Sequence, residues 1–387
     1  MKFLHTGDWH LGKVFYEKSL LEDQEHFLNN LFSLIESSAK TEPYSAICIP
    51  GDIYDRSIPS AEAVDLLNSF LVKVHDSFPA LKILLLAGNH DSANRLGFAK
   101  DILSTANIYI CSDTKNFTQP IIIENTAFYQ LPFLYPASLP EKDTFSTRAK
   151  SQKELFKQAL EEIKERHSKN FSHLSSVLCA HTSVFSTDQT DPLHEVGSVD
   201  CVPPEYFDTF TYTCLGHIHK MQKVSKSAWY SGSPLAYSFD ESKEKYLLSV
   251  EIKNNKAVVE KIPVKPLHSV VRLKGAFEYF FSRKQFDAYK DSYIEIVCTD
   301  NKIVENPMEL LHPKFPNLLS FVRENSVFSS QSQNMQMKRK LFSSQEENPK
   351  EIIKLFIQEL RDDLSASEKE IEAFMELYKS VKEEENK

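Results

Sequence analysis

Short runs of apolar, β-forming residues recur along the first 265 residues, and segments with helical spacing separate the early runs. Leu66, Phe70 and Val74 lie four residues apart, and Leu28 and Phe32 repeat this spacing in an earlier segment, which predicts two amphipathic helices. Strands that alternate with helices favour a layered α/β core. The predicted strands are residues 3–5, 46–49, 83–87, 108–111, 121–123, 127–133, 177–180, 212–215, 229–230, 246–252 and 257–264.

The second half of this region contains more strands than helices. We therefore expect a second sheet that packs on the first, which gives a four-layer α-β-β-α sandwich over residues 1–265. Residues 147–170 predict one further helix on the surface, because they carry closely spaced charges of both signs.

Three segments are predicted to follow the sandwich, with a boundary near Pro263 and Pro266. Residues 266–328 form a small α/β domain with strands at 268–273, 293–298 and 316–323 and helices at 277–290 and 307–312. Residues 329–345 have the Ser, Gln and Met content of a linker. Residues 346–387 are helical.

The predicted helices of the tail each begin with a capping pattern. Asn348 and Pro349 occupy the cap and first positions of one helix, and Ser367 with Glu370 opens the other. Their apolar stripes need a surface to pack on, which is either the body of the protein or a partner. The stripes are Ile353, Phe356, Ile357, Leu360 and Leu364, and Ile371, Phe374, Met375 and Tyr378.

Composition excludes few classes of function. The net charge is −9, but residues 346–387 hold 13 acidic and 7 basic residues, so charge neither supports nor excludes a polyanionic substrate. The six cysteines form no CxxC pair and are expected to be small buried thiols. The first residues, MKFLHTGDWH, predict neither a signal peptide nor a membrane span, and a reducing cytoplasm fits these features.

Polar segments rich in Asp, Asn and His follow several of the predicted strands. They are GDWH at residues 7–10, GDIYD at 51–55, GNHD at 88–91 and GHIH at 216–219, and His181 follows another apolar run. Strand ends are where α/β sheets place ligands. Oxygen and imidazole donors of this kind suit manganese, iron or zinc. The sequence therefore predicts one metal site built from all five segments.

Two ions are more consistent with the number of donors than one, because a single catalytic ion needs only three or four protein ligands. The expected ligands are Asp8, His10, Asp52, Asn89, His181, His217 and His219. Asp52 is the expected bridge between two ions, which would act together on a phosphoryl group. His90 is expected to protonate the leaving oxygen or stabilise the pentacoordinate phosphorus, and Asp91 to orient His90. The chain has no P-loop and no GxSxG motif.

These segments resemble the five signatures of the calcineurin-like metallophosphoesterases. GDWHLGK, GNHDSANRL and YSGSPLAYSFDE are similar to its nuclease branch, and the likeness covers residues 1–265. The resemblance implies two manganese ions, one held by Asp8, His10, Asp52 and His219. The other would be held by Asp52, Asn89, His181 and His217, with His90 as the catalytic histidine and Asp91 beside it.

The resemblance also implies an activity and partners. Such a nuclease is a 3′→5′ exonuclease on double-stranded DNA ends and an endonuclease on single strands and hairpins, and serves DNA repair and recombination. It works as a dimer with a coiled-coil ATPase, which its C-terminal helices bind, while the small domain caps the cleft and touches DNA. Lys13, Arg56 and Arg95 follow metal segments closely and are candidate phosphate contacts.

Two other classes of function are consistent with part of the pattern. A phosphatase or cyclic-nucleotide phosphodiesterase of the same superfamily would use the same metal site, but has little need for a cap, a linker and paired helices. A non-catalytic scaffold for a partner ATPase would not need the complete set of ligands. Activity on nitrophenyl phosphate esters against activity on duplex ends distinguishes the first class.

Overall fold

The computed structural model describes residues 1–135, 151–184, 201–300, 304–324, 368 and 371–372. The chain divides into two compact units, one formed by Met1–Cys298 with Val304–Phe321 and one by Thr299–Ile303 with Val322–Lys387. The predicted linker and all but three residues of the tail lie outside the described residues, so the two tail helices stay a prediction. Within the part that is described, no helix is both long and apolar enough to span a membrane.

The first sheet contains the early strands of the chain in the order β14-β13-β1-β4-β5-β6. β1 (Lys2–His5), β4 (Ala46–Ile49), β5 (Lys82–Leu86) and β6 (Ile108–Cys111) are parallel. β13 (Tyr246–Lys253) pairs antiparallel with β1, and β14 (Lys256–Pro263) pairs antiparallel with β13 at the edge of the sheet. Helices α1 (Leu21–Ser38) and α2 (Ala61–Ser77) pack their apolar stripes against it, and Phe27, Leu67, Phe70 and Val74 are all buried there.

The second sheet has the order β11-β12-β10-β9-β8-β7. Its bounds are β7 (Ile121–Ile123), β8 (Thr126–Leu131), β9 (Ser175–His181), β10 (Tyr212–Gly216), β11 (Gln222–Lys223) and β12 (Ala228–Tyr230). The long helix α5 (Gln152–Asn170) and the short 3-10 helix η3 (Pro204–Phe207) lie beside it. α5 is less solvated than its charge pattern predicts, because Leu155, Phe156 and Ile163 are completely buried against the sheet.

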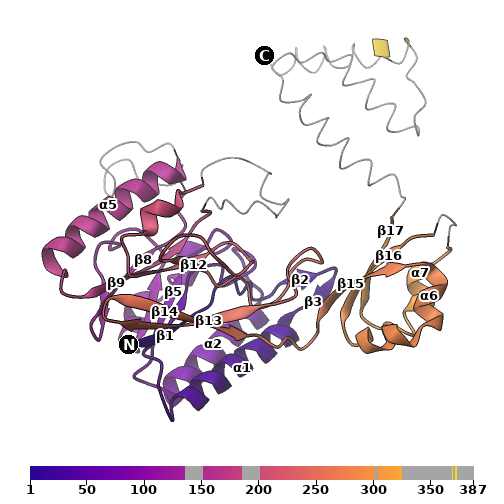
Figure 1. Ribbon diagram of the computed structural model, residues 1–387, viewed down its shortest axis with the longest axis horizontal. Coiled ribbons are helices and arrows are strands. Elements are labelled where there is room, and N and C mark those ends of the chain that lie inside the picture. The colour runs from indigo at the N-terminus through magenta and orange to yellow at the C-terminus, as the bar shows by residue number, and fades with distance from the viewer. Residues whose placement is uncertain (136–150, 185–200, 301–303, 325–367, 369–370, 373–387) are drawn as a thin grey trace. The chain divides into compact units, whose positions relative to one another are not determined.

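A third apolar layer joins the two sheets face to face. Phe3 and Ala46 come from the first sheet and Phe128 and Val177 from the second, and all four are completely buried. Figure 1 shows α1 and α2 on one side of the paired sheets and α5 on the other, which confirms the α-β-β-α sandwich. The stacking directs the carboxyl ends of strands from both sheets to one region, where the metal segments follow.

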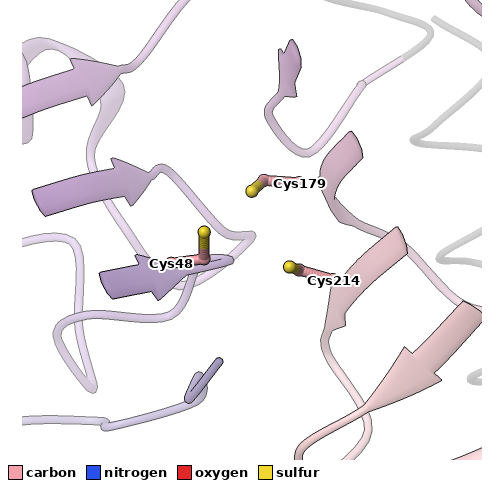
Figure 2. Close-up of side chains that lie close together, drawn as sticks. All are labelled: Cys48, Cys179 and Cys214. Carbon is pink, nitrogen blue, oxygen red and sulfur yellow. The ribbon is translucent and has the colours of Figure 1, made fainter. Parts of the chain in front are cut away.

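Three cysteines meet inside this layer. Cys48 lies on β4, and Cys179 and Cys214 lie on β9 and β10 (Figure 2). Their sulfur atoms lie within 4.8 Å of one another, and the side chains are buried. The environment is apolar, as expected for thiols that act as small hydrophobic residues.

A small sheet follows the sandwich in the order β15-β16-β17, with bounds Val270–Gly275, Tyr293–Cys298 and Leu318–Arg323. The predicted continuous helix over residues 277–290 is wrong. α6 (Phe277–Ser282) ends at Arg283, whose backbone is extended, and the 3-10 helix η4 (Lys284–Tyr289) follows. The break lets Phe280 and Phe286 stack 5.1 Å apart in the small core, and α7 (Pro307–Leu311) closes it.

The hydrophobic pattern did not predict four elements, because they are too short to show a period. They are β2 (Val14–Phe15), β3 (Lys18–Ser19), α3 (Ala93–Leu96) and α4 (Lys100–Ser104).

Buried Asp23 on α1 accepts hydrogen bonds from the Tyr293 hydroxyl at 2.7 Å and the His268 amide at 3.0 Å, and so joins the small sheet to the sandwich. The boundaries proposed for the separate domains stay predictions.

Candidate metal centre

The seven expected ligands lie where strands of the two sheets end. β1 leads to Asp8 and His10, β4 to Asp52, and β5 to Asn89. His181 is the last residue of β9, and His217 and His219 directly follow β10. Parallel strands deliver their carboxyl ends to one edge, so residues more than 200 positions apart meet.

One group of donors centres on His10 and His219. Their Nε2 atoms lie 3.1 Å apart, and Asp52 Oδ2 is 3.6 Å from His10 Nε2. Asp8, His10 and Asp52 form one cluster with metal-ligand spacing. Asp8 Oδ1 accepts the His217 amide at 2.8 Å, while buried Asp8 Oδ2 has no hydrogen-bond partner within the described parts of the chain. A cation is the partner that such a carboxylate oxygen lacks.

The second group centres on Asn89. Its Oδ1 lies 3.0 Å from both His181 Nε2 and His217 Nδ1. Asp52 Oδ2 is 3.4 Å from His181 Nε2, so the same oxygen that faces His10 also faces this group. Asp52, His181 and His217 form a cluster with ligand spacing. The residues fit two adjacent divalent cations that share one carboxylate.

The histidine tautomers suit ligand roles. His181 Nδ1 donates to the Pro50 carbonyl at 2.8 Å, because a carbonyl can only accept. His219 Nδ1 lies 3.0 Å from the carboxylate of Glu241 and donates to it. In the neutral form of each ring the proton therefore sits on Nδ1, and Nε2 offers its lone pair to a metal, as in metal-bound histidines with an orienting partner.

The backbone at the ligands is strained. Asp8, His10, Asp52 and His217 have positive φ angles of 54°, 46°, 50° and 109°. Left-handed backbone costs a non-glycine residue roughly 1–2 kcal/mol, and such residues cluster at functional sites. Rigid packing around the four residues maintains these conformations.

Glycines let the two sheets approach within this centre. A Cβ atom at Gly51 would lie 2.1 Å from His181 Nδ1, and one at Gly88 would lie 2.1 Å from Asp52 Oδ1. At Gly216 it would lie 1.9 Å from the Pro50 carbonyl oxygen. The glycines that precede these ligand groups are therefore needed for space, and Gly51, with φ of 95°, also for its backbone angle.

Burial and charge shift the pKa values within the cluster. Burial raises the pKa of Asp8 to about 6, against the opposite effect of His181. Burial alone would lower the pKa of His181, but the charges of Asp52 and Asp8 raise it to about 9. Burial opposes ionisation of Asp52 as well, yet His181 holds its pKa well below the usual range. The metal-free protein thus keeps a proton on His181 at neutral pH, which a bound metal displaces.

His90 lies exposed at the edge of the cluster, and its ring packs 4.8 Å from the ring of His10. Its orienting partner differs from the one expected. His90 Nδ1 donates to the backbone carbonyl of Asp55 at 2.9 Å. Asp91 instead accepts the amides of Ile53, Tyr54 and Gly88 at 2.9–3.0 Å. Asp91 therefore holds the GDIYD and GNHD loops together and does not orient His90.

Two acidic residues near the ligands were not expected. The Asp55 carboxylate lies 3.5 Å from His10 Nδ1 and 2.8 Å from Lys13 Nζ. Glu241 pairs with His219 and with Lys245. Burial opposes ionisation of Glu241, but its bonds with His219 and Lys245 lower its pKa to about 2. Both residues stand in segments quoted for the family resemblance, GDIYD and YSFDE, and that was the only signal for them.

The three candidate DNA contacts differ in environment. Lys13 is partly buried against Asp55, and Arg56 has 75% of its side chain exposed with Asp55 Oδ2 at 3.8 Å. Arg95 is exposed on α3 beside an apolar groove. Lys13 and Arg56 lie next to the metal ligands, and Arg95 lines the groove together with Tyr54 of the GDIYD segment.

Comparison with known proteins identifies the family. A model of the calcineurin-like phosphoesterase family matches residues 1–221. The SbcD subunit of the SbcCD nuclease from Staphylococcus saprophyticus is 31% identical over 336 residues, covering 85% of this chain and 86% of that protein. The corresponding SbcD subunit from Staphylococcus epidermidis is 32% identical over 335 residues, with the same coverage. The chain is thus a metal-dependent phosphodiesterase that belongs to the calcineurin-like phosphoesterase family.

Proposed function

We propose that this phosphodiesterase is a two-metal DNA nuclease that uses manganese. It digests double-stranded ends as a 3′→5′ exonuclease, cuts single strands and hairpins as an endonuclease, and acts in DNA repair and recombination. The observation that carries the proposal is the pair of donor groups that share Asp52 Oδ2, with exposed His90 beside them. The names of the two relatives, both nucleases, support DNA as the substrate.

In this proposal Asp8, His10, Asp52 and His219 hold one ion, and Asp52, Asn89, His181 and His217 hold the other. When bound, such a pair of ions activates water and neutralises charge on the phosphoryl oxygens. The protein supplies the fixed geometry, because the tight loops at the four ligands with positive φ leave little room for rearrangement.

His90 is the proposed proton donor. Since its Nδ1 donates to the Asp55 carbonyl, the proton that can reach a substrate is the one on Nε2. From Nε2, His90 then protonates the leaving 3′ oxygen or stabilises the pentacoordinate phosphorus. Its exposure, in contrast to the buried metal ligands, lets it touch a bound phosphodiester.

The proposed partner is an SbcC-type ATPase, because both relatives are named as the SbcD component of the SbcCD nuclease. We assign the contact to the amphipathic helices of residues 346–387, and the DNA-facing cap to residues 266–328. DNA is the other proposed partner, and a cytoplasmic location is consistent with both.

We propose that two copies of the chain form a homodimer within a heterotetramer with the ATPase. Phe98 and Ile102 are 81% and 72% exposed, and they lie near an apolar groove of about 510 Å³ lined by Val64, Val72 and Phe98. Exposed apolar surface of this kind is typical of contacts between protomers, and a second copy of the same face would cover it. Sedimentation analysis of Phe98→Asp should find monomers, and a dimer as tight as the wild type would contradict this assignment.

The function is tested with purified protein and manganese on a blunt duplex, a single strand and a hairpin. We expect cleavage of the single strand and hairpin by the chain alone, and ATP-dependent digestion of duplex ends only with an SbcC-type ATPase. Nitrophenyl phosphate and cyclic nucleotides are the comparison substrates. Efficient hydrolysis of these without DNA cleavage would make the chain a phosphatase or cyclic-nucleotide phosphodiesterase instead.

A further inference from the structure

Within the proposed metal centre, the surroundings of His219 differ from those of His181. The carbonyl that orients His181 belongs to the backbone, whereas a side-chain carboxylate, Glu241, lies 3.0 Å from His219 Nδ1. Glu241 is 22 residues beyond His219 and is the last residue of the YSGSPLAYSFDE segment. A carboxylate at Nδ1 raises the basicity of the ring and fixes the nitrogen that faces the metal.

Lys245 holds this carboxylate in place. Its ammonium group lies 2.6 Å from Glu241 Oε2, 2.9 Å from Ser233 Oγ and 3.2 Å from the backbone carbonyl of His219. Three acceptors satisfy the three donors of a lysine. Lys245 therefore binds both the carboxylate that contacts the His219 ring and the backbone that carries the ring.

The rest of the segment closes around the same histidine. The Ser233 amide donates to the His219 carbonyl at 3.1 Å. Gly232 has φ of 74°, and a Cβ there would lie 2.6 Å from the same carbonyl oxygen. The Tyr237 ring lies 5.3 Å from the His10 ring and 5.5 Å from the His219 ring, so it packs against both.

His10 has a carboxylate near Nδ1 as well, although its buried Nδ1 makes no hydrogen bond with the described residues. Asp55 Oδ1 lies 3.5 Å from His10 Nδ1, and Lys13 Nζ lies 2.8 Å from the same oxygen. Both histidines of one donor group thus have a carboxylate at Nδ1, and each carboxylate has a lysine. In the other group, His181 Nδ1 bonds the Pro50 carbonyl at 2.8 Å and has its nearest carboxylate oxygen among the described residues, Asp8 Oδ1, at 3.9 Å, while His217 Nδ1 lies 3.0 Å from the amide oxygen of Asn89.

We propose that Glu241, clamped by Lys245, is a positioning residue that sets the affinity of the ion held by His10 and His219 without affecting the other ion. The proposal rests on the two-metal function above. Glu241 acts through His219 and does not touch the substrate.

The isosteric variant Glu241→Gln tests the charge and the acceptor rather than the shape. Lys245 can only donate, so it attracts the amide oxygen, and the NH₂ group turns toward His219. That NH₂ donates to Nδ1, which places the histidine proton on Nε2 and blocks the lone pair that would bind a metal. A role in packing alone predicts wild-type behaviour for this variant.

The measurement is a titration of the metal-free, full-length protein with Mn²⁺, with free Mn²⁺ followed by electron paramagnetic resonance. For Glu241→Gln and Glu241→Ala we expect one of two ions to bind about 10–100-fold more weakly, as for other partners of metal-bound histidines. The second ion should bind within about twofold of wild type. Glu244→Gln is the matched control, because Glu244 is exposed and its carboxylate accepts only from Tyr246 at 2.8 Å among the bonds described, so both affinities should be unchanged.

Three results would overturn the inference or its basis. Wild-type affinities in both Glu241 variants would remove Glu241 from the site. Equal weakening of both ions, together with a lower melting temperature of the metal-free variants, would reduce Glu241 to a structural residue. A wild-type protein that binds fewer than two ions would instead refute the proposed two-metal function itself.

Discussion

Asp52→Asn is the most informative single change, because Asp52 is the proposed bridge. Its Oδ1 accepts the His90 amide at 3.0 Å, and its Oδ2 faces His10 and His181. In the variant the amide oxygen should stay at the His90 amide, because turning it away would leave a donor without an acceptor at a cost of about 1–3 kcal/mol. The NH₂ group then occupies the bridging position and offers hydrogens where both ions need a lone pair.

The magnitude follows from the two coordination spheres that lose a ligand. Loss of an outer partner of a metal ligand already costs about 10–100-fold in affinity, so each ion should weaken by at least about 100-fold. At an Mn²⁺ concentration of 100 times the wild-type Kd, binding stabilises the fold by about 2.7 kcal/mol per ion, and a 100-fold weaker site by about 0.4 kcal/mol. The metal-dependent rise in melting temperature should therefore almost vanish.

The assay combines bound Mn²⁺ per chain after dialysis, melting temperature with and without Mn²⁺, and nuclease rate. Asp113→Asn is the control for an Asp-to-Asn change outside the centre, since Asp113 pairs with Lys100 at 2.6 Å. The control should retain both ions and the full thermal shift. If Asp52→Asn did the same and kept its nuclease rate, Asp52 would not be the bridge, and the two-metal geometry would have to be assigned differently.

Three further predictions concern catalysis, DNA and the partner. His90→Gln should abolish turnover while both ions and DNA stay bound, because His90 touches the transition state and not the ions, and loss of metal would make it a ligand. Neutralising Lys13, Arg56 or Arg95 should each flatten the log–log salt dependence of DNA binding by about one unit, and unchanged slopes for all three would leave them as ordinary surface charges. Deleting residues 346–387 should preserve metal binding and cleavage of single strands but abolish binding of an SbcC-type ATPase and digestion of duplex ends. An unfolded or inactive truncated protein would place the tail in the body of the fold.

Local pattern was sufficient for most of the sandwich. Strands such as β4 and β6 have the bounds that their apolar runs predict, because β4 is buried and β6 at least half-buried over the whole length, and such strands are apolar throughout. The same pattern failed at Arg283, where a continuous helix was expected. Packing of Phe280 against Phe286 favours a break in this helix, and the spacing of apolar residues along the sequence does not predict such a break.

The sequence also predicted the types of metal donor, because a combination of Asp, Asn and His at several strand ends has few functions other than metal binding. The sequence could not give the position of Asp52 Oδ2 between the two donor groups. It depends on how β9 of the second sheet faces β4 of the first, and the two strands are more than a hundred residues apart. Distances of this kind are set by the packing between the sheets.

The residues that hold the donors in place could be found only in the tertiary structure. Asp91 adjoins His90 in sequence but binds backbone amides of the neighbouring loop, while the carbonyl of Asp55 orients the ring. Glu241 reaches His219 because the intervening segment folds back on Lys245. The sequence alone determined which chemical groups are present and at which strand ends they lie. Which group contacts which was decided by the fold, because hydrogen bonds act over about 3 Å and depend on residues far apart in the chain.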